Sequence, residues 1–157
     1  MNSCHLLIVD DDEAIRLVLA EFFTNCGYEV VTAGDGEEAL KKFVPGGFDC
    51  VISDLMMPKI DGLELLKRIR MQDRLVFFLM ITGFPDIDSA VNAIKEGAYD
   101  YVTKPFHLED VRIKVERILS IRKTHKSLKT MTGLFWALIA SVPIWLILGI
   151  ILGMVWK

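Results

Sequence analysis

The chain has 157 residues, enough for one domain of ordinary size and a small additional element. Its formal charge of −3 conceals three unlike segments: residues 1–110 carry 20 acidic and 10 basic side chains, residues 111–130 carry one acidic and 7 basic side chains, and residues 132–156 carry none. The remaining basic side chain is that of Lys157. The acidic main segment argues against nucleic acid as a partner, because phosphate contacts require lysine and arginine on the binding face.

Short apolar runs typical of buried strands alternate with segments of helical periodicity from the amino terminus onward. Strands are expected at 5–10, 29–33, 48–54, 75–82 and 99–104, and helices from 13 to a stop at Gly27, at 36–43, at 63–70, at 87–96 and from 108 onward. Five strands alternating with five helices indicate βαβ units. We therefore expect an α/β fold with a parallel sheet covered on both faces.

Polar side chains stand where four of the expected strands end. Asp10 ends the first strand and Asp11 follows it, Asp54 ends the third, Thr82 ends the fourth and Lys104 ends the fifth. In open parallel sheets the functional site lies beyond the carboxyl ends of the strands. We expect these side chains to share one pocket.

Three carboxylates in one pocket repel one another and remain ionised only beside positive charge. Hard oxygen ligands with one nearby ammonium suit Mg2+, which also bridges carboxylate and phosphate oxygens. A carboxylate placed beside Mg2+ and lysine can attack phosphorus and form an acyl phosphate. By contrast, Asp12 and Glu13 open a helix, where the helix dipole favours acids, and are interpreted as a helix start.

Four stretches, LLIVDDDEAIR, VISDLMMPKIDGLELL, FLMITG and GAYDYVTKPF, resemble the signature blocks of the response-regulator receiver domain, especially receivers of the nitrogen-regulator type. The resemblance covers about residues 3–121, with every block in order. It implies a flavodoxin-like, doubly wound five-stranded sheet of order 2-1-3-4-5. It also implies a phosphoacceptor signalling protein of a two-component system that catalyses only its own phosphoryl transfer and hydrolysis.

The resemblance also assigns a metal site. Asp54 would accept the phosphoryl group from a histidine kinase or phosphotransfer protein. Asp11, the Asp54 carboxylate and the backbone carbonyl of Met56 would hold Mg2+, with Asp10 supporting the ion through water.

Three further roles follow from the same resemblance. Thr82 and Lys104 would grip the phosphoryl group. Tyr101 would be the switch aromatic, turning inward when Thr82 moves toward the phosphate. The bond between Lys104 and Pro105 would be cis, a form that only X-Pro bonds adopt readily.

The three cysteines, Cys4, Cys26 and Cys50, are odd in number and have no C-x-x-C spacing. We expect free thiols that are buried or partly buried, as suits a reducing compartment. The amino terminus has no basic segment followed by a long apolar core, so no cleaved signal peptide is expected.

The uncharged segment predicts a transmembrane helix at 132–156. Its 24 residues from 133 to 156 would form a helix about 36 Å long, enough to cross a bilayer core of about 30 Å. Trp136 and Trp156 would lie at the two interfaces. Gly133, Ala137, Ser141, Gly149 and Gly153 share one ridge, which suits pairing with a second copy or a partner helix but also occurs in lone helices.

Seven basic residues precede the segment and only Lys157 follows it, which predicts a single pass through the inner, cytoplasmic membrane with the receiver in the cytoplasm. The predicted organisation is a receiver domain at 1–121, a basic linker at 122–131 that continues the last receiver helix, and the membrane helix. The chain is expected to be a single-domain regulator that signals by protein contact or acts as a phosphate relay or sink, unless it is a fragment of a longer regulator.

Two other readings remain. The chain could be a membrane-tethered scaffold that keeps the receiver fold without accepting phosphate. A haloacid-dehalogenase-like phosphotransferase also uses a nucleophilic aspartate and Mg2+, but it needs a second aspartate two residues after the nucleophile, where this chain has Met56. The sequence names neither the kinase, the stimulus nor the downstream partner.

Overall fold

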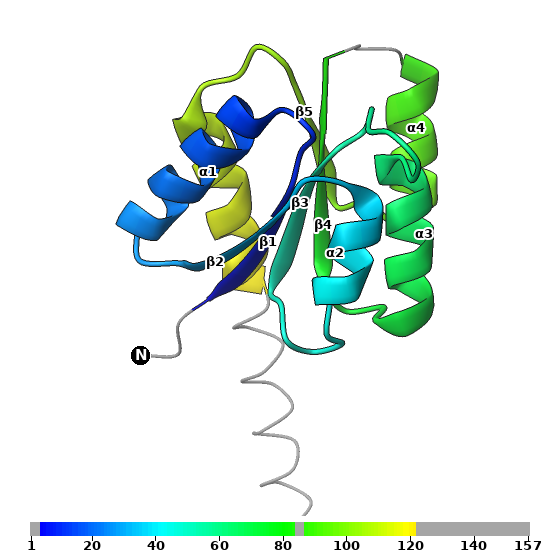
Figure 1. Ribbon diagram of the computed structural model, residues 1–157, viewed down its shortest axis with the longest axis horizontal. Coiled ribbons are helices and arrows are strands. Elements are labelled where there is room, and N and C mark those ends of the chain that lie inside the picture. The colour runs from blue at the N-terminus through cyan, green and yellow to red at the C-terminus, as the bar shows by residue number, and fades with distance from the viewer. Residues whose placement is uncertain (1–3, 84–86, 122–157) are drawn as a thin grey trace, which may run out of the picture. The chain divides into compact units, whose positions relative to one another are not determined.

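A computed structural model of the chain describes residues 4–83 and 87–121. Five parallel strands form one sheet in the order β2-β1-β3-β4-β5 (Figure 1). The strands are β1 (His5–Val9), β2 (Glu29–Ala33), β3 (Cys50–Asp54), β4 (Phe77–Thr82) and β5 (Asp100–Thr103), and the helices are α1 (Glu13–Asn25), α2 (Gly36–Lys42), α3 (Gly62–Gln72), α4 (Ile87–Lys95) and a last helix at 108–121. The expected flavodoxin-like sheet and its strand order are confirmed.

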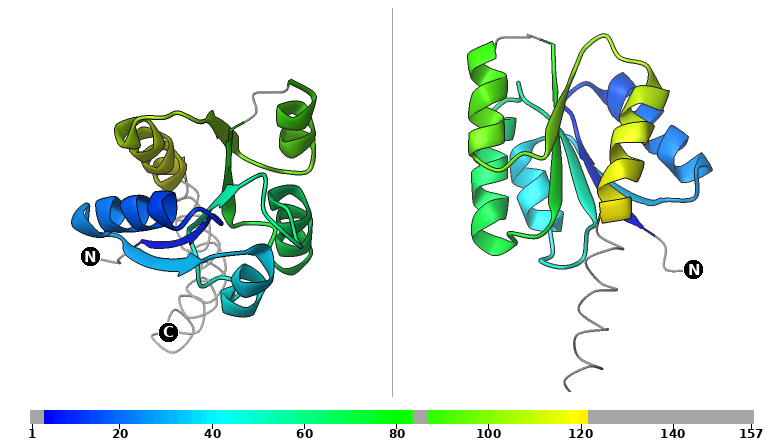
Figure 2. Two further views of the ribbon diagram at one scale, coloured as in Figure 1. Left: turned by 45° about the horizontal axis from the view of Figure 1, so that its top comes forward. Right: turned by 180° about the vertical axis from the view of Figure 1, so that it is seen from behind.

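Helices cover both faces of the sheet. Helix α1 and the helix at 108–121 lie on one face, and α2, α3 and α4 lie on the other (Figures 1 and 2). Every residue of the central strand β3 is buried, as is every residue of β4 except Phe77. Strands covered on both faces have no solvent side, so their sequences are continuously apolar rather than alternating.

The register of the sheet brings the polar strand ends to one edge. Val9 pairs with Ser53, Asp54 with Ile81, and Thr82 with Thr103. Asp10, Asp54, Thr82 and Lys104 therefore follow or end neighbouring strands at nearly the same height.

Aspartates begin three of the helices. The side chains of Asp12, Asp35 and Asp61 accept hydrogen bonds from backbone N–H groups of the first turns of α1, α2 and α3. These bonds satisfy donors that have no partner within the helix. The interpretation of Asp12 as part of a helix start is confirmed.

Some element boundaries differ from those expected. Strand β4 begins at Phe77 rather than at residue 75, because the Asp73 carboxylate accepts hydrogen bonds from the backbone N–H groups of Leu75 (2.7 Å) and Val76 (3.1 Å) and holds them in a turn. Helix α3 is longer than expected at both ends. Side-chain hydrogen bonds to nearby backbone groups, such as those to Asp73, compete with the backbone hydrogen bonds between strands.

None of the three cysteines forms a disulfide within the described residues, and their burial differs from expectation at one position. Cys50 is buried and Cys4 partly buried, whereas Cys26 is exposed. Burial raises the pKa of the Cys50 thiol to about 12.

Among residues 4–83 and 87–121, no helix is long and apolar enough to cross a bilayer. The predicted linker at 122–131 and the predicted membrane helix at 132–156 lie outside the described residues.

The thiols provide a test of the packing. At neutral pH we expect Cys26 to react with iodoacetamide, and Cys50 to react only after denaturation, because thiolate is the reactive form and Cys50 is both enclosed and protonated. Peptide mass spectrometry of the native and denatured protein measures both. Equal alkylation of the two thiols in the native protein would contradict the burial of Cys50.

Candidate functional site

Three carboxylates gather at the carboxyl edge of the sheet. Asp10 and Asp54 are nearly inaccessible to solvent, with exposed fractions of 1% and 6%, and Asp11 is exposed. Oxygen atoms from all three side chains lie within 4.8 Å of one another. The acids predicted to gather at the strand ends do so, with two of them buried and one exposed.

Lys104 lies between the two buried carboxylates. Its Nζ is 2.9 Å from Oδ2 of Asp54 and 3.0 Å from Oδ2 of Asp10. The backbone N–H of Lys104 donates to the carbonyl of Thr82 at 2.7 Å. The end of β4 therefore holds the backbone from which the lysine side chain extends. The peptide bond between Lys104 and Pro105 is cis, as expected.

Backbone N–H groups donate hydrogen bonds to the other oxygen of each buried carboxylate. Oδ1 of Asp54 accepts the N–H of Leu55 at 2.8 Å, and Oδ1 of Asp10 accepts the N–H of Asp12 at 2.9 Å. Each acid is thus oriented by its own loop, and its Oδ2 is turned toward Lys104. Arg16 adds a hydrogen bond from Nη1 to the backbone carbonyl of Asp10 at 2.6 Å.

The pKa values in the pocket reflect burial and pairing. Burial raises the pKa of Asp10, although its hydrogen bonds to Lys104 and to the backbone of Asp12 oppose the rise. Burial would lower the pKa of Lys104, but its hydrogen bonds to Asp54 and Asp10 prevail and raise that pKa. The lysine therefore stays charged, and a single ammonium faces three carboxylates.

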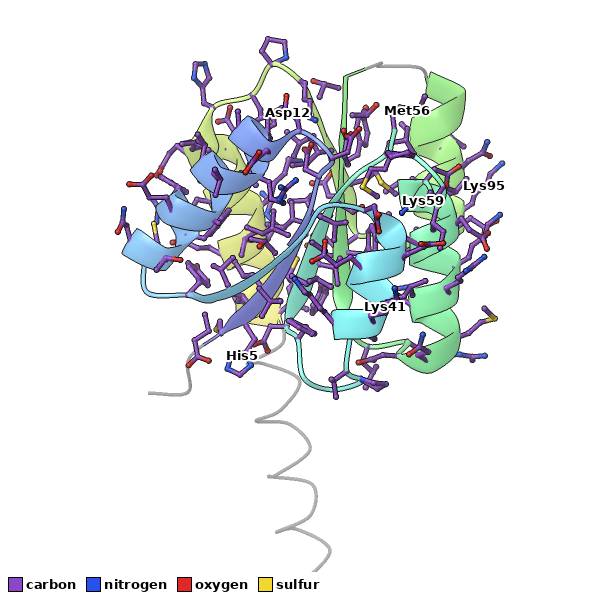
Figure 3. All side chains as sticks on the ribbon, viewed as in Figure 1. His5, Asp12, Lys41, Met56, Lys59 and Lys95 are labelled. Atoms are coloured by element: carbon purple, nitrogen blue, oxygen red, sulfur yellow. The ribbon has the colours of Figure 1, made fainter. Side chains whose placement is uncertain are left out.

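The donor set fits a hard divalent cation. Carboxylate oxygens are the ligands that Mg2+ prefers, and the mixture of buried and exposed acids leaves room for the waters that this ion retains. Met56, whose carbonyl was assigned to the same site, lies in the loop after β3 at this edge of the sheet (Figure 3). Its side chain is 58% exposed and points away from the core.

The two switch residues lie on neighbouring strands. Thr82 ends β4 and is 4% exposed, one position beyond the register partner of Asp54. Tyr101 lies on β5 and is 38% exposed, so its ring is not enclosed in this conformation. The inward turn expected of Tyr101 stays a prediction.

Two supporting residues were missed at the sequence level. One is Arg16, whose bond to Asp10 is described above. The other is Gly62, where a β-carbon would lie 2.2 Å from the carbonyl oxygen of Asp54 and 2.9 Å from Sδ of Met80. Its N–H also donates to the carbonyl of Leu55 at 2.9 Å. The helix start packs directly on the backbone of Asp54, and the only sequence signal for this is a glycine immediately after the capping Asp61.

Residues 6–116 match the model of the response regulator receiver domain family. The chain belongs to this family. Receiver domains of two-component response regulators accept phosphoryl groups, in a transfer that the domain itself catalyses.

Curated relatives agree with the family. The chain is 41% identical over 114 residues to the alkaline phosphatase synthesis transcriptional regulatory protein PhoP of Bacillus subtilis, covering 73% of this chain and 48% of that protein. It is 38% identical over 113 residues to the DNA-binding transcriptional regulator NtrC of Klebsiella pneumoniae, covering 72% of this chain and 24% of that protein. The chain thus spans about half or less of the length of these relatives, and the two identities do not single out a nitrogen-regulator type.

A solved structure gives the same result. The CheY-like receiver domain protein of Methanospirillum hungatei superposes with a TM-score of 0.76 at 28% identity, covering 79% of this chain and 99% of that chain. The match spans nearly all of a receiver and confirms the receiver fold.

The close approach at Gly62 generates a prediction. Gly62→Ala should lower the free energy of unfolding by about 1–3 kcal/mol, because the added methyl group meets backbone atoms that cannot move without displacing Asp54. Urea denaturation measures the change. Gly83→Ala is the matched control, since no atom of residues 4–83 and 87–121 lies within 4 Å of a β-carbon there. Equal losses for both variants would contradict the packing argument.

Proposed function

We propose that this receiver accepts a phosphoryl group on Asp54 from a histidine kinase or a phosphotransfer protein. The observation that carries the proposal is the contact of Lys104 with the buried carboxylates of Asp54 and Asp10, with Asp11 at the mouth of the pocket. A lysine enclosed by acids at the carboxyl edge of a parallel sheet is suited to hold an anionic group against the carboxylate.

The transfer itself requires little from the protein beyond position and charge. An oxygen of Asp54 forms a bond to phosphorus as the bond between phosphorus and the kinase histidine nitrogen breaks, and the electron pair leaves with that nitrogen. Lys104 lies against Oδ2 of Asp54 and can follow the charge onto the phosphoryl oxygens. Thr82, at the end of the neighbouring strand, can donate a hydrogen bond to one of those oxygens.

The pocket would hold Mg2+ through Asp11, Asp54 and the Met56 carbonyl, with Asp10 acting through water. When bound, the ion would offset the charge that gathers on the phosphoryl oxygens. The chain's own contribution is to orient the carboxylates, which it does with the backbone N–H groups of Leu55 and Asp12.

Phosphorylation would be read by protein contact or relayed onward. The face formed by α4, β5 and the helix at 108–121 carries exposed apolar side chains at Val91, Ile94, Tyr101 and Ile113. Movement of Thr82 toward the phosphoryl group would free space for Tyr101, and an inward turn of this ring would change that face. A phosphate relay or sink would use the same phosphorylation site but would not require a change in this face.

Membrane anchoring is the second part of the proposal. The support is the sequence alone: residues 132–156 are uncharged, and the basic residues before them favour a single-pass protein with the receiver on the cytoplasmic side of the inner membrane. A tethered receiver would meet its kinase at the membrane surface.

The phosphoacceptor is tested with Asp54→Asn. Acetyl phosphate or a cognate kinase should label the unaltered chain and not this variant, because an amide cannot form the acyl phosphate. Phosphate-affinity electrophoresis measures the product. Asp49→Asn, at the opposite edge of the sheet, is the control and should label normally. Unchanged labelling of Asp54→Asn would refute the assignment.

The scaffold alternative is tested on the unaltered chain with beryllofluoride and Mg2+. A chain that binds no beryllofluoride would be a scaffold rather than a switch.

Metal binding predicts a pH-dependent stability gain. At neutral pH, Mg2+ at about 100 times its dissociation constant should stabilise the fold by about 2.7 kcal/mol. Because the folded pKa of Asp10 lies above its unfolded value, protonation of Asp10 favours the fold at low pH, and this contribution is lost as pH rises through the folded pKa. A protonated Asp10 is neutral and attracts the cation less. The gain in stability from Mg2+ should therefore shrink as the pH falls. Thermal denaturation with and without the metal measures it, and Asp11→Asn should weaken it.

Anchoring is tested by fractionation. The full chain should stay with the membrane after an alkaline wash, and a chain lacking residues 131–157 should be released, because the uncharged segment supplies the apolar area that holds a protein in a bilayer. Immunoblots of the membrane and soluble fractions measure the outcome. Release of both forms would contradict the anchor and leave the phosphoacceptor proposal untouched.

A further inference from the structure

The loop between β3 and α3, residues 55–61, carries two backbone groups of the phosphorylation site. The N–H of Leu55 orients the carboxylate of Asp54, and the carbonyl of Met56 is the proposed ligand of Mg2+. Met56 makes no backbone hydrogen bond within the part of the chain that the structure describes. The direction of its carbonyl therefore depends on how the rest of the loop is held.

Lys59, three residues after Met56, has an unusual backbone conformation. Its φ is 68°, and every other positive φ among the described residues belongs to a glycine. This left-handed conformation is costly for a residue with a side chain, and it persists only where surrounding contacts fix it. The contacts of Lys59 and of its neighbour Ile60 therefore indicate what holds the loop.

The ammonium group of Lys59 lies against the start of α2, and Figure 3 shows Lys59 between α2 and α3. Its Nζ is 2.8 Å from Oδ2 of Asp35 and 3.5 Å from Oε2 of Glu37. The other oxygen of Asp35, Oδ1, accepts the N–H of Glu38 at 2.8 Å and so begins the helix. The hydrogen bond from Lys59 lowers the pKa of Asp35, which keeps this carboxylate ionised at neutral pH. One aspartate thus starts α2 and holds Lys59.

Close packing fixes the next residue of the loop against the same helix. A β-carbon added to Gly36 would lie 2.7 Å from the carbonyl oxygen of Ile60 and 2.8 Å from its Cβ. The N–H of Ile60 in turn donates to the carbonyl of Pro58 at 2.9 Å. Lys59 and Ile60 are therefore both held by the start of α2, one through charge and the other through contact.

We propose that Lys59 is a positioning residue for the metal site. Its ion pair with Asp35 holds the loop in the conformation in which the carbonyl of Met56 reaches Mg2+. This role rests on the proposed binding of Mg2+ at this edge of the sheet. It gives the start of α2 an influence on the affinity for the metal, although this helix contributes no ligand.

The test measures the dissociation constant of Mg2+ by isothermal titration calorimetry on the full chain in a non-ionic detergent. Lys59→Met should raise this constant about two- to five-fold, the range expected for the loss of an exposed ion pair. The sign is diagnostic, because the loss of a positive charge near an acidic site would by itself strengthen the binding of a cation. Lys59→Arg keeps the charge and should bind Mg2+ as the unaltered chain does.

Lys67→Met is the matched control. Lys67 lies on α3, where its Nζ is 3.6 Å from Oε1 of Glu96. The substitution also removes an ammonium group from an exposed ion pair, but that pair does not involve the loop at 55–61. The affinity for Mg2+ should therefore not fall.

The second partner is tested with Asp35→Asn. Asparagine can still accept the N–H of Glu38, so α2 keeps its start while the ion pair is lost. This variant should weaken the binding of Mg2+ about as much as Lys59→Met does. The double variant should bind no more weakly than either single variant, because both substitutions remove the same interaction. If only net charge mattered, the double variant would bind Mg2+ like the unaltered chain, which would overturn the proposal.

Two further outcomes separate the positioning role from the proposed function. If the unaltered chain binds Mg2+ and Lys59→Met binds it equally or more tightly, only the positioning role is refuted. If the unaltered chain binds no Mg2+, the proposed metal site is refuted and the positioning role fails with it. The midpoint of thermal unfolding, measured without Mg2+, verifies that each variant is folded during the titration.

Discussion

The balance of charge around Lys104 is the constraint on which the site depends. Two carboxylates with almost no access to water face one ammonium, and a third lies at the mouth. Burying a charge is costly unless it is paired and hydrogen-bonded, so each buried acid needs both the lysine and a backbone donor. The cluster is stable enough to persist and still has an excess of negative charge. That excess negative charge favours the binding of a cation. A bound cation would in turn reduce the repulsion between the acids and an incoming phosphoryl group.

The fold supplies this arrangement through its backbone rather than through additional side chains. The loops after β1 and β3 each turn an N–H group onto the aspartate that precedes it, at Leu55 for Asp54 and at Asp12 for Asp10. Gly62 lets α3 begin against the carbonyl of Asp54. Asp10 is therefore oriented by the residue that caps α1, and the backbone of Asp54 lies against the start of α3. The packing of the fold and the geometry of the site cannot be altered independently.

Much of the fold and the site could be predicted from residue patterns. The alternation of strands and helices predicted a parallel sheet, and in such a sheet polar residues at the strand ends must share an edge. Boundaries were less predictable, because Asp73 takes Leu75 and Val76 out of an apolar run that reads as strand. The exposure of Cys26 was also missed, since apolar periodicity says little about the end of a surface helix. Gly62 and Arg16 were missed because their roles depend on distances of a few ångströms between elements.

The sequence by itself determined the alternation of elements, the chemical types at the strand ends and the family to which they belong. It also contains the uncharged segment at 132–156, which remains a prediction. Only the tertiary structure decided which oxygens Lys104 contacts, on partners 94 and 50 positions away along the chain. It alone showed that Asp73 joins the loop before β3 to the turn before β4, by accepting the N–H groups of Gly46 and Leu75. Side-chain patterns record which residues will be buried or exposed, but contacts between distant segments depend on how the helices and strands pack, and packing exists only once the chain has folded.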